Sequence, residues 1–128
     1  MTKKDLAAFK ALVQTYIVKH RHTTDYREEL KMEKKNDALD FLEAHGFHGD
    51  KAKDYLNQEY YRQLIAMERR YEAMQELAVA AYYENDCDHE HPAVRDAINN
   101  AKREGKKLNI NPDDAEFDIA SMCFEYRR

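Results

Sequence analysis

Residues 60–83 read YYRQLIAMERRYEAMQELAVAAYY. This segment contains no glycine or proline, and its apolar residues recur in alternating steps of four and three. The seam consists of Tyr60, Leu64, Met67, Tyr71, Met74, Ala78 and Ala81. Such heptad spacing keeps one face of a helix apolar over about three repeats. We expect a helix of about residues 51–83, with Asp50 as its N-cap and with Ile65 and Leu77 widening the buried stripe.

The apolar seam can be buried in two ways. Other helices of the same chain can bury it, or a second copy can pair with it to form a homodimer through residues 60–81. A stripe broader than a strict two-stranded seam favours burial within the chain.

The whole chain predicts an all-α fold. Three glycines and two prolines in 128 residues are too few for the many turns of a sandwich or barrel. We expect a first helix that begins with a capping box of Thr2 and Asp5 and runs to about His20. We expect a second helix from Thr23 or Thr24, either of which can cap it, to Gly46. Further helices are expected from Pro92 to Gly105 and from Pro112 onwards. Together with the long central helix, this gives a single helical domain over residues 1–128. It contains five helices, or six if the second one breaks near residue 36.

Charge and cysteine usage limit the classes of protein. The net charge is −4, but residues 1–24 carry +4 (five Lys/Arg against one Asp), whereas residues 82–91 carry −4. The two cysteines, Cys87 and Cys123, provide no disulfide framework. The first residues lack the apolar core of a signal peptide, and no run reaches the roughly 18 apolar residues of a membrane span. We therefore expect a cytoplasmic protein with no membrane partner.

Residues 84–94, ENDCDHEHPAV, are the one stretch with metal-ligand chemistry. Cys87, His89 and His91 are weak candidate zinc ligands because thiolates and imidazoles bind zinc. Ligands at i, i+2 and i+4 point the same way only in an extended segment, and no second ligand cluster follows. We predict no metal and no cofactor, and we interpret the acidic residues as favourable to the positive N-terminus of the helix at Pro92.

The sequence contains no recognisable catalytic motif. The patterns G-x-x-x-x-G-K, G-x-G-x-x-G, H-E-x-x-H and G-x-S-x-G are all absent. We therefore predict a protein that is not an enzyme.

A nucleic-acid-binding regulator is the second hypothesis. Residues 37–62 predict two helices joined by a glycine turn, which is the pattern of a helix-turn-helix. The side chains that would meet phosphates and base edges are Lys51, Lys53, Asn57, Gln58 and Arg62. Acidic neighbours on the same segment oppose this hypothesis, because they repel the DNA backbone.

Docking on a protein partner is the leading hypothesis. Nine tyrosines and no tryptophan are unusual for this length, and exposed tyrosines and arginines are enriched at protein interfaces. The candidate contact residues are Tyr61, Arg69, Arg70 and Tyr83. The sequence thus predicts a small regulatory or inhibitory binding protein, of the kind found among phage proteins.

Overall fold

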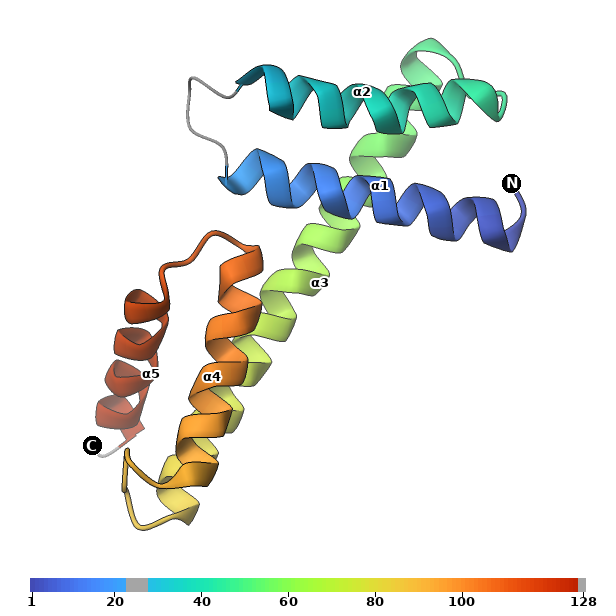
Figure 1. Cartoon of the computed structure of the whole chain (residues 1–128). Coiled ribbons are helices and arrows are strands. Elements are labelled where there is room, and N and C mark those ends of the chain that lie inside the picture. The colour runs from blue at the N-terminus through green and yellow to red at the C-terminus, as the bar shows by residue number, and fades with distance from the viewer. Residues whose placement is uncertain (23–27, 127–128) are drawn as a thin grey trace. The chain divides into compact units, whose positions relative to one another are not determined.

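The computed structural model describes the backbone of residues 1–22 and 28–126 and the side chains of residues 1–18 and 32–123. These residues form five α-helices and no strand (Figure 1). The helices are α1 (Lys3–His22), α2 (Glu28–Ala44), α3 (Gly49–Glu84), α4 (Pro92–Lys107) and α5 (Pro112–Tyr126). The all-α prediction is confirmed, including the long helix expected over about residues 51–83.

The helix boundaries differ from the expected ones in detail. Helix α2 runs without a break through Asn36, so the chain has five helices and not six in the described part. Helix α3 begins at Gly49, which places Asp50 in its first turn and not at the N-cap. The predicted caps Thr23 and Thr24 lie outside the described residues.

Local hydrogen bonds explain where several helices begin and end. At the start of α1, the Asp5 N–H donates to Thr2 Oγ1 and the Thr2 N–H donates to Asp5 Oδ2, both at 3.1 Å. This reciprocal pair is the predicted capping box. After α2, Gly46 has φ +91°, and the Phe47 N–H donates to the Leu42 carbonyl at 2.9 Å. Glycine is required there because other residues rarely adopt this left-handed backbone.

The chain divides into two compact units, residues 1–65 and 66–128, which we call the N-terminal and C-terminal units. Helix α3 contributes residues to both. In the N-terminal unit, α1 and α2 lie side by side and antiparallel (Figure 1). Its buried apolar side chains are Phe9, Val13, Ile17, Ala38, Leu42, Ala52 and Leu56. The Phe9 ring packs edge-on against Tyr55, with 5.3 Å between centroids.

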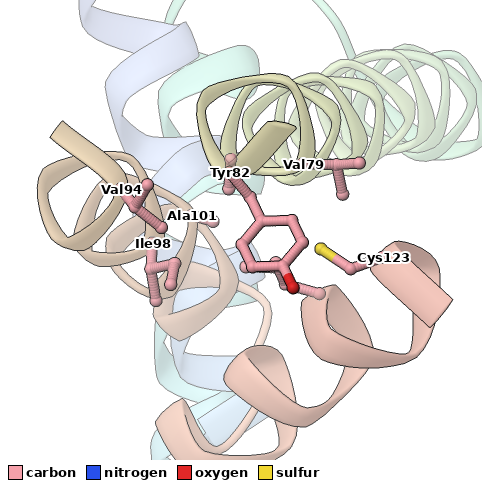
Figure 2. Close-up of a cluster of buried hydrophobic side chains, with 8 residues drawn as sticks. Val79, Tyr82, Val94, Ile98, Ala101 and Cys123 are labelled. Carbon is pink, nitrogen blue, oxygen red and sulfur yellow. The ribbon is translucent and has the colours of Figure 1, made fainter. Parts of the chain in front are cut away.

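The core of the C-terminal unit is built from all three of its helical segments. Figure 2 shows the Tyr82 ring extending from α3 into the space between α4 and α5. The buried cluster consists of Ala78, Val79 and Tyr82 of α3, Val94, Ile98 and Ala101 of α4, and Ile119 and Cys123 of α5. Burying a large apolar side chain stabilises a fold by about 1.5–3 kcal/mol, so this cluster holds the three segments together.

Gly105 has a different role from the predicted one. Helix α4 continues past it to Lys107, and the left-handed residue that closes the helix is Asn109, with φ +60°. The Ile110 N–H donates to the Gly105 carbonyl at 2.9 Å in this closing turn. Gly105 itself is buried, and a Cβ placed on it would lie 2.8 Å from Cε2 of Tyr71. The prediction that Gly105 ends the helix is wrong, because this glycine serves close packing against the Tyr71 ring.

The apolar seam of α3 is covered largely by helices of the same chain. Tyr60 packs against Tyr16 of α1, with 5.2 Å between ring centroids, and Tyr71 and Ala78 are buried in the C-terminal unit. Ile65 and Leu77 are 47% and 57% exposed, so the prediction that they widen the buried stripe is wrong. Each is one residue away from a seam member, which turns it about 100° around the helix. The homodimer through residues 60–81 stays a hypothesis.

No helix in the described part of the chain combines the length and apolar character needed to cross a membrane.

Gly105→Ala tests the close contact with Tyr71. Alanine normally favours a helix interior over glycine, but here the added methyl group collides with an aromatic ring. We expect the free energy of unfolding to fall by about 1–3 kcal/mol, measured by urea denaturation. The loss should shrink in a Tyr71→Leu background. Stabilisation by Gly105→Ala in the wild-type background would contradict the contact.

The single-domain prediction has its own test, because α3 is shared by the two units. Losing the packing of either unit should weaken the whole helix, since helical stability comes mostly from tertiary packing. Leu56→Ala in one unit and Ile98→Ala in the other should each cost about 2–5 kcal/mol. We expect NMR signals from both units to lose native intensity at one common urea midpoint in each variant. Two separate midpoints, each shifted by one variant alone, would show two independent domains.

Candidate docking groove

An open groove of about 580 Å³ lies along α3 in the C-terminal unit. Among the described residues, it is lined by Glu76, Val79, Ala80 and Tyr83. Their spacing of i, i+3, i+4 and i+7 places them in one row on the helix, about 10 Å long. Three of the four side chains are apolar or aromatic, so the groove offers apolar surface with one carboxylate beside it.

Two of the groove-lining side chains, Val79 and Tyr83, are fixed by contacts with the rest of the C-terminal unit. Val79 is 6% exposed and belongs to the buried cluster shown in Figure 2. The Tyr83 hydroxyl donates a hydrogen bond to the Cys123 carbonyl of α5 at 2.5 Å. The Tyr83 ring also meets the Tyr82 ring edge-on, with 5.3 Å between centroids. Because these side chains are already fixed, an occupant would not have to order them on binding.

The electrostatic character of this part of α3 is acidic. Residues 71–91 contain six Asp and Glu and no Lys or Arg. Glu72 and Glu76 are both exposed, and neither takes part in an ion pair within the described residues. Arg70 is the nearest preceding basic residue in the sequence, and it pairs with Glu104 of α4. The stretch of α3 that lines the groove is therefore acidic.

The four predicted partner-contact residues differ in exposure, in ion pairing and in whether they line the groove. Tyr61 is 60% exposed, belongs to the N-terminal unit and is not among the groove-lining residues. Arg70 is tied to the nearly buried Glu104 of α4, with Nε 3.1 Å from Oε1. Arg69 is exposed. Of the four, Tyr83 alone lines the groove.

The predicted nucleic-acid contacts are all exposed, but they share their surface with acids. Lys51, Lys53, Asn57, Gln58 and Arg62 lie on the first part of α3. Asp50 and Asp54 are also exposed there. With 3.6 residues per turn, these two carboxylates fall between the two lysines around the helix. They repel the phosphate backbone that the lysines would attract. The nucleic-acid hypothesis stays a prediction.

Arg62 is already engaged by a carboxylate of its own helix. Its Nε donates to Glu59 Oε2 at 2.9 Å, and its Nη2 contacts Glu59 Oε1. Burial raises the pKa of Glu59, but the hydrogen bonds from Arg62 and Gln63 outweigh that effect and leave this pKa below its ordinary value. The same hydrogen bond raises the pKa of Arg62. The pair is thus an internal ion pair, which reduces the positive charge available to a ligand.

The three metal-ligand candidates make three separate contacts. Cys87 lies in the left-handed turn that ends α3, and its N–H donates to the Tyr82 carbonyl at 2.9 Å. The His89 ring packs on the Tyr82 ring, with 4.4 Å between centroids. The His91 Nδ1 accepts the N–H of Ala93 at 3.1 Å and so caps α4. Within the described residues, no three His, Cys, Asp or Glu side chains are grouped to hold a metal.

The N-cap acceptor of α4 is the imidazole of His91, a contact that the interpretation of the acidic loop did not include. A favourable effect of the loop carboxylates on the helix N-terminus stays a prediction. Pro92 follows at the first position of the helix, as predicted.

Sequence reasoning missed three of the four groove residues, namely Glu76, Val79 and Ala80. Their signal was present as a second row of helical spacing that ends at Tyr83. The row was overlooked because the seam beside it is longer and more apolar. Three nearly buried polar side chains were also not predicted from the sequence, namely Glu59, Gln75 and Glu104.

Comparison with known proteins finds no family model, curated protein or solved structure that matches this chain.

His91→Ala tests the capping role of the imidazole. Loss of an N-cap acceptor costs about 1 kcal/mol, and we expect that loss in the free energy of unfolding measured by urea denaturation. His91→Asn should restore most of it, because asparagine is a good N-cap. Glu90→Gln is the matched control and should change little. An equal loss in Glu90→Gln would indicate that loop charge, and not the cap, stabilises α4.

Proposed function

We propose that this protein is a small, non-enzymatic binding protein that docks on a protein partner through the groove of Glu76, Val79, Ala80 and Tyr83. The groove itself carries the proposal: an open, mostly apolar row on α3 whose tyrosine is fixed by a hydrogen bond to α5. Aromatic side chains held in place beside apolar pockets are the usual anchors of protein interfaces.

The role we propose for this binding is regulation or inhibition of the partner, as in small phage-encoded regulators. The support is compositional: 36% of the residues are charged, and the sequence contains none of the common catalytic motifs. We place the protein in the cytoplasm, because two cysteines provide no disulfide framework, which suits a reducing compartment.

Site-specific photocrosslinking tests docking at the groove. A benzophenone amino acid replaces Ala80 in the groove, or Ala73 two turns earlier on the same exposed flank of α3. In cells of the native host, we expect the probe at 80 to give one protein adduct of defined mass that resists EDTA and nuclease. The probe at 73 is the matched control and should give much less of it.

Three outcomes would overturn the proposal. They are no adduct at position 80, equal adducts at both positions, or an adduct that nuclease removes. The last of these would favour the nucleic-acid hypothesis instead.

A further inference from the structure

We infer that the occupant of the groove is an amphipathic helix of the partner, with basic side chains beside its apolar stripe. This inference rests on the proposed function and names the chemistry of the partner.

The shape of the groove fits a helix. The groove-lining residues form a straight row along α3, about 10 Å long, which corresponds to two turns of a helix lying beside it. Side chains of one helix pack into the gaps between side chains of another, and a helix lying in an apolar groove is a common way of binding a peptide. Ala80 is small, so a partner helix can approach α3 closely at that point.

The charge of the groove selects the chemistry of that helix. Glu76 lines the groove, Glu72 precedes it by one turn, and both lack an ion pair within the described residues. Basic side chains on the partner would neutralise them, which favours association and its rate. The same acids repel the phosphates of nucleic acids and of anionic lipids, so a basic protein segment is the favoured class of ligand.

Model peptides test this inference directly. The probe is a fluorescein-labelled helix of 18 residues with leucines at i, i+3, i+4 and i+7 and lysines elsewhere. Its matched control keeps the leucines and replaces every lysine with glutamate. By fluorescence anisotropy at low salt, we expect the basic peptide to bind roughly tenfold or more tightly than the acidic one. Its affinity should fall as salt rises.

Protein variants locate the binding. Ala80→Lys fills the groove and offsets the charge of Glu76, and it should weaken binding of the basic peptide about tenfold or more. Asn99→Lys adds the same charge to an exposed position of α4 that is not among the groove-lining residues, and it should weaken binding less than about threefold. Glu76→Lys is a second groove variant, and its exposed side chain makes it compatible with folding. Circular dichroism should show the same helix content in all three variants.

The outcomes separate this inference from the proposed function. Three results would overturn the inference that the occupant is a basic helix: equal binding of both peptides, no binding of the basic peptide, or equal effects of Ala80→Lys and Asn99→Lys. A groove-specific crosslink at position 80 would still support protein docking in that case. Failure of the crosslink would remove the proposed function itself.

A second copy of this chain is the competing occupant. The exposed part of α1 offers Lys3, Lys4 and Lys10 together with Ala7, Ala8 and Ala11. Analytical ultracentrifugation should show that the wild-type protein and the Ala80→Lys variant are both monomers. Self-association that Ala80→Lys abolishes would assign the groove to the second copy and overturn a foreign partner.

Discussion

The apolar stripe of α3 is the constraint on which the rest of the structure depends. A helix of 36 residues is not stabilised by propensity alone, so its apolar face must be covered along its length. Helices α1 and α2 belong to the unit containing its first part, and α4 and α5 to the unit containing its second part. In the C-terminal unit the cover lies over Tyr71, Ala78 and Tyr82, which leaves the neighbouring flank with Ala80 exposed. The groove is thus a consequence of how this stripe is covered.

Polar contacts at the border of the stripe fix how the C-terminal unit packs. The Gln75 side chain donates to the Tyr71 hydroxyl at 3.1 Å, and Tyr71 packs against Gly105 of α4. Glu104 is 9% exposed and pairs with Arg70, joining α3 to α4. A nearly buried carboxylate is costly unless it is paired, so these contacts favour one register of the two helices over others.

Local patterns explain why much of the fold was predictable. The heptad spacing, the Thr2 box, Gly46 and Pro92 act through neighbouring residues, and the structure confirms each of them. Apart from the N-cap expected at Asp50, the errors concern long-range packing. Neighbouring residues predict a helix end at Gly105, and they carry no sign of its contact with Tyr71, which lies 34 positions earlier in the chain. The groove was missed because exposure of one helical row depends on which flank the other helices cover, and helical spacing alone does not state that.

The proposed function rests on the contrast between two flanks of α3 in the C-terminal unit: one is buried, and the other is open and lined by apolar and acidic side chains. The most direct measurement is an NMR titration of the labelled protein with the partner isolated from its native host. The account predicts that the largest chemical-shift changes fall on the groove row of residues 76–83. Changes confined to residues 51–62, or spread without preference over the chain, would contradict it.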